Sequence, residues 1–289
     1  MYKYNKKTLD NGLKIIAHKM PQMKSAALGI WIAAGGRYEN MDNRGISHFT
    51  EHLLFKGTKK RTTVQIKNSI EGIGGVLNGF TSEEVTCYFT KVIGRHIGLG
   101  LDVLSDMVLN AKFDPKDVRM ERSVILEEIK MYKDHPDQHV HELLAELLWP
   151  KQTLGIPLIG TFRTVHSLKR RDLIEYRNKF YNPSNITIAA CGDVNWDIFL
   201  KNCEDTFLKK RAAGPLSFGK IEISQKAPKI KILGKATEQT NIAIGFHGIR
   251  RNDPARYAMD ILNVALGANM SSRLFHELRE KRGLAYAIS

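Results

Sequence analysis

The 289-residue sequence has few cysteines and lacks a long apolar run. Its three cysteines, Cys87, Cys191 and Cys203, are odd in number and have no metal-binding spacing. They read as buried or idle thiols in a reducing compartment, so a disulfide framework is not expected. The first residues lack the apolar segment of a signal peptide, and no run approaches the ~20 apolar residues that span a bilayer. We therefore expect a cytoplasmic protein without a membrane span.

A nucleic-acid-binding motif is also lacking, although the chain is basic. The sequence holds 44 Lys and Arg against 30 Asp and Glu, a net charge of +14. Such a charge would suit nucleic acid or another acidic surface, but the basic residues are scattered and form no patch interleaved with aromatic residues. We expect no nucleic-acid partner. The length and the 43% hydrophobic content suffice for two domains or one large one.

One short stretch carries chemistry, with His48, Glu51 and His52 in the pattern H-x-x-E-H. On a helix, His48 and His52 project from one face a turn apart and can hold one metal ion. Glu51 can then reach a metal-bound water as a general base. Asp42 or Asn43 is expected to cap this helix, and Gly57 to end it. The other interpretation, a chance match, remains open on the motif alone.

A zinc site needs a third protein ligand, and one predicted helix offers carboxylates for it. Asp114 and Pro115 form a strong helix start, and no Gly or Pro follows before Lys133. Glu121 and Glu128 lie two turns apart on one face, with Val124 and Ile125 between them. Glu127 points away and is the weaker candidate. Without the H-x-x-E-H motif, a solvated helix face would be the better interpretation.

Taken together, these residues resemble the insulinase/pitrilysin family of zinc metallopeptidases, within it the branch of the mitochondrial processing peptidase β subunit and its bacterial relatives. That family combines H-x-x-E-H with a distant E-x6-E, which Glu121 and Glu128 match. The resemblance implies Zn²⁺ bound by His48, His52 and Glu128, with Glu51 as general base and Glu121 supporting a ligand. Further matching stretches span the chain: 74–81, 155–161, 272–275 and 283–286.

The resemblance also implies a fold and an activity. The expected fold is α+β, with two similar halves that each hold a mostly antiparallel sheet with helices packed on one face. The expected activity is zinc-dependent hydrolysis of peptides or presequence-like segments, bound as an added β-strand in a chamber between the halves. The strand through Asn78 and Gly79 would be the edge that pairs with substrate. The family usually has Ala at position 79, and Gly79 could loosen that edge. The alternative is a non-catalytic assembly or core subunit with the same fold.

The order of predicted elements indicates how the domains are divided. We expect a zinc-bearing domain over 1–210, a linker over 211–228 and the start of a second, similar domain over 229–289. Residues 240–247 resemble 24–31, which hints at a repeat of about 216 residues. The second half is then incomplete, so we expect either a fragment or a remainder supplied elsewhere. The other expected elements are strands at 8–18, 25–34, 76–81, 84–91 and 186–190, and helices at 62–71, 95–110, 164–180 and 196–209.

A second histidine cluster follows the glutamate helix. His135, His139 and His141 lie close together, but Pro136 separates the first two, so they do not share a helical turn. A new helix, capped by Asp134 or Asp137, is expected to run to residue 148, and we interpret the histidines as surface residues.

An arginine and a tyrosine seven residues apart stand near the end of the sequence. Arg279 and Tyr286 match the spacing that family members with both halves in one chain carry in the second half. The resemblance implies that they stabilise the negative charge that develops on the scissile carbonyl oxygen. The plain alternative is ordinary polarity at a helix end. Heterodimeric relatives divide the zinc motif and this pair between subunits, so finding both here suggests a self-sufficient chain that forms a homodimer. A heterodimer with a related subunit is the alternative.

Overall fold

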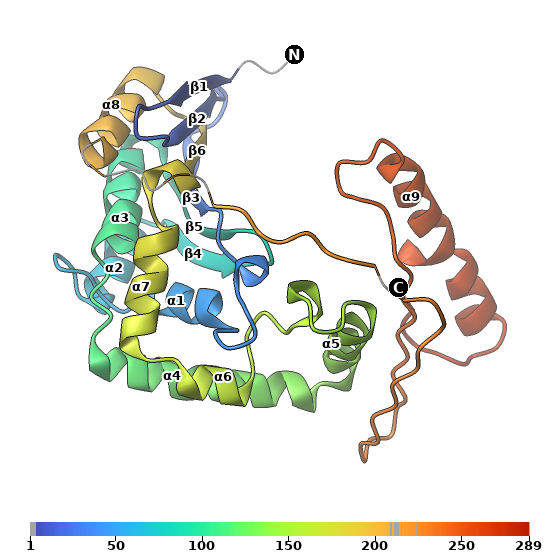
Figure 1. Ribbon diagram of the computed structural model, residues 1–289. Helices are drawn as coiled ribbons and strands as arrows, with labels where there is room; N and C mark the ends of the chain where they lie inside the picture. Colours follow the sequence, from blue (N-terminus) through green and yellow to red (C-terminus); the bar gives the residue numbers. More distant parts are fainter. Residues whose placement is uncertain (1–3, 209, 211–213, 215, 224, 289) are drawn as a thin grey trace. The chain divides into compact units, whose positions relative to one another are not determined.

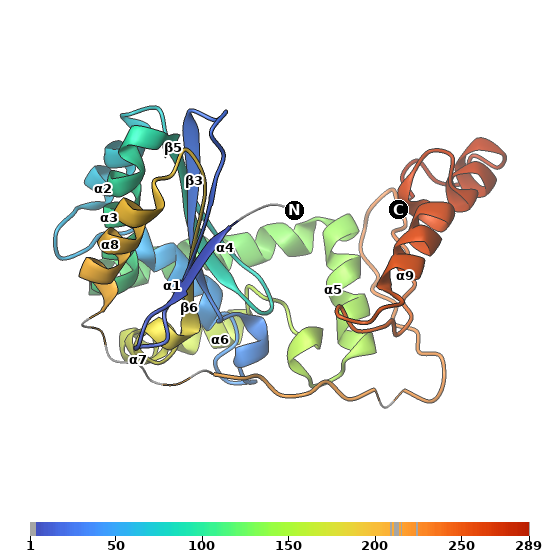
Figure 2. The same ribbon diagram turned by 90° about the horizontal axis from the view of Figure 1, so that it is seen from above.

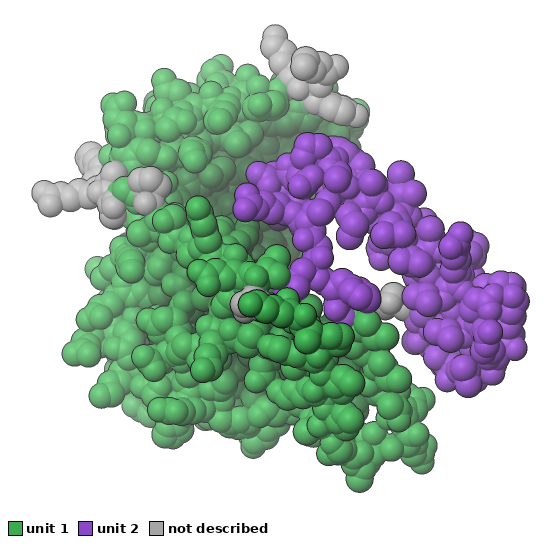
Figure 3. Space-filling view, turned by 45° about the vertical axis from the view of Figure 1, so that its right-hand side comes forward, with its two compact units in different colours: residues 1–244 green, residues 245–289 purple. Residues whose placement is uncertain are grey.

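The computed structural model describes residues 4–208, 210, 214, 216–223 and 225–288. The chain divides into two compact units, residues 1–244 and 245–289 (Figure 3). Within the described ranges, no helix has the length and the apolar character needed to cross a membrane.

The first unit is built on one six-stranded sheet with the order β1-β2-β6-β3-β5-β4 (Figure 1). Its strands are β1 (Asn5–Thr8), β2 (Lys14–Lys19), β3 (Ser25–Ile32), β4 (Val76–Thr81), β5 (Thr86–Ile93) and β6 (Ile186–Gly192). Among these described strands, β2 and β6 run parallel and the other neighbours pair antiparallel. The sheet is therefore mostly antiparallel, as expected, and β4 forms one of its edges.

Helices cover one face of this sheet. The helices of this unit are α1 (Ile46–Leu54), α2 (Thr63–Glu71), α3 (Ile97–Asn110), α4 (Pro115–Asp134), α5 (Pro136–Leu148), α6 (Phe162–Ser167), α7 (Arg170–Phe180) and α8 (Trp196–Phe207). Of these, α1, α2, α3 and α8 pack against the strands, and α5 packs against α4 instead. Figure 2 shows α2, α3 and α8 together on one side of the strands. Burial alternates accordingly at the end of β3, where Ile30 and Ile32 are buried but Trp31 between them is 39% exposed. The core thus lies between the sheet and the helices, which confirms the α+β prediction.

Two predicted elements of the first unit are each split in two. The predicted strand over 8–18 is a hairpin instead, because the chain turns at Asn11 and Gly12 and β1 pairs back onto β2. Gly12 has φ +85°, a left-handed conformation that glycine adopts readily. The predicted helix over 164–180 is α6 followed by α7, because the backbone at Lys169 is extended. The Asp172 side chain accepts a hydrogen bond from the backbone N–H of Lys169.

The cap of α5 also differs from the prediction. His135 occupies the N-cap position, in place of Asp134 or Asp137, and Pro136 begins the helix. His135 and His139 were not expected to share a helical turn, but the His139 N–H donates to the His135 carbonyl at 2.9 Å, so the two flank the first turn of α5.

The chain after α8 holds few regular elements. The predicted linker over 211–228 lies partly outside the described residues, as does the predicted helix end at 209, and residues 216–223 and 225–228 form neither helix nor strand. The second unit contains α9 (Arg256–Asn263) and two π-helical segments, Val264–Ala268 and Phe275–Glu280. Residues 240–247 form no strand, although they resemble residues 24–31, which include most of β3. The domain boundaries stay a prediction.

Candidate metal centre

Helix α1 carries the H-x-x-E-H residues and starts differently from the prediction. Its N-cap position is Gly45 with φ +84°, which has no side chain to cap the helix. Neither Asp42 nor Asn43 caps it: the Asn43 side chain accepts the backbone N–H of Asn40 instead. The Glu39 carboxyl group accepts the backbone N–H groups of Gly45 and Ser47, each at 2.8 Å, and the Ile46 N–H donates to the Asn43 carbonyl.

Three side chains from α1 and α4 converge on one point. The imidazoles of His48 and His52 lie 4.5 Å apart between ring centroids, one turn apart as the spacing predicts. Glu128 Oε2 lies 3.8 Å from His48 Nε2 and 3.9 Å from His52 Nε2. One ligand atom from each residue lies within 4.8 Å of the others, and this is the one such group among the described residues.

Helix α4 supplies the carboxylates from a face that differs slightly from the predicted one. Its buried residues include Glu121, Ile125 and Ile129, whereas Val124 is 49% exposed. The apolar residue between the two glutamates is therefore Ile125 alone. Glu127 points to solvent and pairs with Lys130, as expected of the weaker candidate.

Glu121 supports the site without facing the point of convergence. It is 4% exposed, and its Oε2 lies 3.1 Å from His52 Nδ1. Its Oε1 lies 2.6 Å from Nζ of Lys56, which follows the end of α1. Burial raises the pKa of Glu121, but the hydrogen bonds from His52 and Lys56 outweigh it and leave the pKa lowered. Glu121 is thus ionised and fixes His52 with Nε2 turned toward Glu128.

The two imidazoles have different electrostatic surroundings. Burial, with the neighbouring His52, lowers the pKa of His48 to about 3. For His52, burial lowers the pKa, but the hydrogen bond to Glu121 and the charges of Glu51, Glu128 and Glu121 together raise it. His48 is therefore neutral at neutral pH, the form that binds a metal ion, whereas the surrounding carboxylates favour the protonated form of His52.

Glu51 lies on the same helix and is held by the sheet. Its Oε2 accepts a hydrogen bond of 2.7 Å from the hydroxyl of Thr81 at the end of β4. Burial raises the pKa of Glu51 above its usual range, against the lowering effect of that hydrogen bond. A raised pKa suits a group that must accept a proton and later give it up.

The edge strand β4 presents the two residues that were expected to meet substrate. Asn78 is exposed, and its side-chain oxygen accepts the backbone N–H of Gly79 at 2.8 Å. A Cβ at Gly79 would come within 3.2 Å of the Phe55 ring and of the Cys87 carbonyl oxygen, so an alanine would require both to shift by a few tenths of an ångström. Gly79 thus gives room to Phe55, a packing role that the sequence comparison did not suggest.

The convergent residues fit a zinc ion. Two imidazole nitrogens and one carboxylate oxygen are the donors of many catalytic zinc sites, which keep a further position open for water. Zinc–ligand bonds of about 2.0–2.2 Å place tetrahedral donors about 3.4 Å apart. The separations of 3.8 and 3.9 Å are close to this value, so small side-chain rotations would bring the donors to a common ion.

The second histidine cluster does not join this site. His139 instead lines a cavity of about 320 Å³ with residues that include Arg44, Tyr132 and Glu142. None of the three histidines of this cluster belongs to the group of convergent ligand atoms in the described chain.

Arg279 and Tyr286 lie together in the second unit. The guanidinium carbon of Arg279 is 4.8 Å from the Tyr286 ring centroid and 4.8 Å from that of Phe275. Tyr286 is 82% exposed. The predicted pair is therefore adjacent, and its role in charge stabilisation stays a prediction.

Three residues of the site were not identified from the sequence: Lys56, Thr81 and Glu39. Lys56 follows His52 at four residues, so helical spacing could have suggested that it shares a partner with His52. Thr81 is the last residue of 74–81, a stretch that resembles the insulinase/pitrilysin family. No local pattern points to Glu39, which reaches α1 from a preceding turn.

Comparison with known proteins supports one family. The family model for insulinase (peptidase family M16) matches residues 14–162, and the model for the peptidase M16 inactive domain matches 167–289. An uncharacterized zinc protease of Streptomyces coelicolor is 40% identical over 97% of this chain and 62% of its own length. The uncharacterized zinc protease YmxG of Bacillus subtilis is 39% identical over 97% of this chain and 68% of its own. The chain thus spans about two thirds of the length of these relatives.

Solved structures share the fold. A protease from Helicobacter pylori matches with a TM-score of 0.86 and 23% identity, over 99% of this chain and 70% of its own. A peptidase M16 inactive domain from Pseudomonas fluorescens matches with a TM-score of 0.83 and 19% identity, over 99% of this chain and 69% of its own. At these identities the likeness concerns the fold alone.

Proposed function

The chain belongs to the insulinase family, peptidase family M16, and from this premise we propose that it is part of a zinc-dependent endopeptidase. The observation that carries the proposal is the convergence of His48, His52 and Glu128 beside the carboxylate of Glu51. The names of the relatives, zinc proteases, support zinc as the metal.

In this proposal each residue of the centre has a distinct task. His48, His52 and Glu128 hold the ion, and Glu121 orients His52. When bound, zinc supplies Lewis acidity toward the scissile carbonyl and toward water. Glu51, turned into position by Thr81, accepts the proton of the attacking water and then donates it to the leaving amine.

The substrate we propose is a peptide or presequence-like segment bound as an added strand. β4 is an edge of the sheet and ends at Thr81, which contacts Glu51. A peptide paired with β4 would therefore run toward the general base. Asn78 and Gly79 lie in the middle of this strand, where a substrate backbone would meet it.

Arg279 and Tyr286 are proposed to stabilise the charge that builds on the carbonyl oxygen. A guanidinium beside a phenol hydroxyl supplies two donors for an oxyanion. In the full-length protein, Arg279→Ala or Tyr286→Phe should lower kcat/KM by about tenfold or more, with zinc content unchanged. Unaltered kinetics in both variants would favour division of the site between related subunits, rather than a homodimer of self-sufficient chains.

A non-catalytic core subunit is the second candidate. The match of residues 167–289 to an inactive-domain model is the observation that favours it. The zinc-binding constellation lies in the other matched region, residues 14–162, where His48, Glu51, His52 and Glu128 are all present. The catalytic proposal accounts for these residues, and the non-catalytic one does not.

Variants of the full-length protein separate the two candidates. Glu51→Gln should keep about one zinc per chain but lose peptide hydrolysis by about 10²–10⁴-fold, because Glu51 is the base and not a ligand. Glu128→Gln should weaken zinc binding itself, whereas Glu127→Gln, one residue away and exposed, is the control and should leave both unchanged. Hydrolysis at the wild-type rate in Glu51→Gln would refute the catalytic assignment.

A further inference from the structure

A buried carboxylate lies at the start of the metal-bearing helix. Glu39 is 6% exposed and follows a short 3₁₀ turn, Gly36–Tyr38. Its Oε2 accepts the backbone N–H of Gly45 at 2.8 Å, and its Oε1 accepts the backbone N–H of Ser47 at 2.8 Å. Oε1 also accepts the Ser47 hydroxyl at 2.5 Å. Three donors from one helix start therefore meet a single side chain.

These contacts replace the cap that α1 lacks. The first N–H groups of a helix have no partner within the helix and are usually satisfied by a side chain at the N-cap. That position is glycine in α1, so the partner comes from six residues upstream. The partial positive charge of the helix N-terminus and these hydrogen bonds offset part of the cost of burying the Glu39 carboxyl group.

A second contact ties the same turn to a neighbouring helix. The Ser47 hydroxyl donates to Glu39 and lies 2.7 Å from the hydroxyl of Tyr176, which then donates to it. Tyr176 belongs to α7 and is 5% exposed. Glu39, Ser47 and Tyr176 thus form a chain of hydrogen bonds from the turn before α1, through its first turn, to α7.

We propose that Glu39 is a positioning residue of the metal centre, which fixes the start and the rotation of α1 and so aims the two imidazoles at Glu128. Ser47 immediately precedes His48, so the anchored backbone is the one that carries the first ligand. Helix α1 is only nine residues long and bears both histidines, whereas Glu128 comes from α4.

The reason is geometric. His48 and His52 lie on one short helix, and each residue turns that helix by 100°. A small rotation at its first turn therefore moves both imidazoles together relative to α4. Metal ligands must be held to within about 0.5 Å of the productive arrangement. The inference rests on the proposed zinc site but not on peptidase activity.

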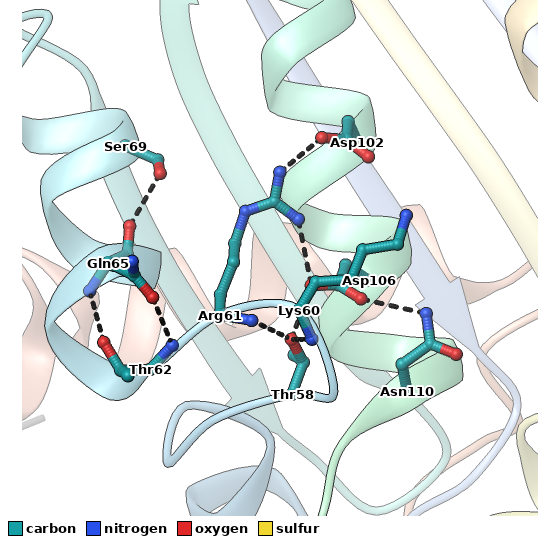
Figure 4. A network of polar contacts seen from close by, with 9 residues as sticks. All are labelled: Thr58, Lys60, Arg61, Thr62, Gln65, Ser69, Asp102, Asp106 and Asn110. Carbon is teal, nitrogen blue, oxygen red and sulfur yellow. Dashed lines mark hydrogen bonds and ion pairs between the residues drawn. The ribbon is translucent and has the colours of Figure 1, made fainter.

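A matched control exists elsewhere in the first unit. Asp106 on α3 is 3% exposed and also accepts three side-chain hydrogen bonds, from Thr58, Arg61 and Asn110 (Figure 4). It anchors the turn after α1 and touches neither its start nor the ligands. A variant at Asp106 therefore reports the cost of losing a buried carboxylate network without disturbing the start of α1.

The test measures zinc affinity by competition with a chelator in the full-length protein, at a temperature at which circular dichroism shows each variant folded. Glu39→Gln keeps the size of the side chain but presents an amide N–H₂ to donors of α1. It should weaken zinc binding about 10–100-fold, as changes around metal ligands do. Asp106→Asn should lower the melting temperature and leave the zinc affinity within about twofold. An unchanged affinity in Glu39→Gln, or equal losses in both variants, would overturn the proposal.

A milder variant keeps the proposal testable if Glu39→Gln does not fold. Ser47→Ala removes the hydroxyl that links Glu39 to Tyr176 but keeps the backbone N–H contact. It should weaken zinc binding about 3–10-fold, and an affinity equal to that of the wild type would contradict the positioning role. Because zinc affinity is the readout, failure here is distinguishable from failure of the Glu51→Gln hydrolysis test.

Discussion

Glu121→Gln tests how the site holds His52. The carboxylate is 4% exposed and receives two donors, His52 Nδ1 at 3.1 Å and Lys56 Nζ at 2.6 Å. A glutamine offers one acceptor oxygen and one N–H₂ group, so one of the two donors would face another donor. The substitution also removes the negative charge that raises the pKa of His52 and makes it a better ligand.

The size of the effect follows from these contacts. A hydrogen bond to a charged group contributes about 1.5–3 kcal/mol net. Loss of one such contact at the ligand corresponds to about a 10–100-fold weaker zinc affinity, since about 1.4 kcal/mol is a factor of ten. We therefore expect Glu121→Gln to retain a zinc site with an affinity reduced by one to two orders of magnitude.

Competition with a chelator measures this change directly. The control is Lys56→Met, which removes one donor but leaves the hydrogen bond between His52 and Glu121 in place. It should change the affinity by less than Glu121→Gln does. An affinity within twofold of the wild type in Glu121→Gln would refute the reasoning, because the His52–Glu121 contact would then have no influence on the metal.

Two further predictions concern Thr81 and Glu39. Thr81→Val removes the hydroxyl that holds the general base, so steady-state assays should show kcat lowered about tenfold with zinc content unchanged, and Thr81→Ser should restore it. Burial raises the pKa of Glu39 from 4.5 to about 7, in spite of the hydrogen bonds from Ser47 and Gly45 and the charge of Arg44. Folding of the zinc-free protein therefore takes up a proton between pH 4.5 and about 7, so the free energy of unfolding falls as the pH rises through this range. Urea unfolding should show that the free energy of unfolding of the wild type falls by up to about 3 kcal/mol relative to that of Glu39→Gln between pH 5 and 8. The Tyr176 hydroxyl, which contacts Ser47, stays neutral over this range.

Local signals in the sequence were sufficient for several elements. Asp114 and Pro115 predict the start of α4 because each has a specific role at a helix N-terminus, and the structure begins the helix there. The four-residue spacing of His48 and His52 likewise predicts that they share a face, since helical geometry alone determines it. The edge position of β4 was expected only from the family resemblance.

Other features depend on contacts between distant parts of the chain. The cap of α1 comes from Glu39, and nothing in the spacing around Gly45 shows that a preceding turn folds back onto it. The exposure of Val124 depends on the exact rotation of α4 against its neighbours, which periodicity gives only to within part of a turn. The break between α6 and α7 was missed because the amphipathic pattern continues across it, although the backbone at Lys169 is extended and not helical.

The central claim is that one zinc ion binds between His48, His52 and Glu128. The most direct measurement is an anomalous difference map from crystals of the full-length protein, with data collected at the zinc absorption edge. We expect a single strong peak in contact with His48 Nε2, His52 Nε2 and Glu128 Oε2, and loss of that peak in His52→Ala. A peak at His135 or His139 in its place, or no peak between the three residues, would contradict it.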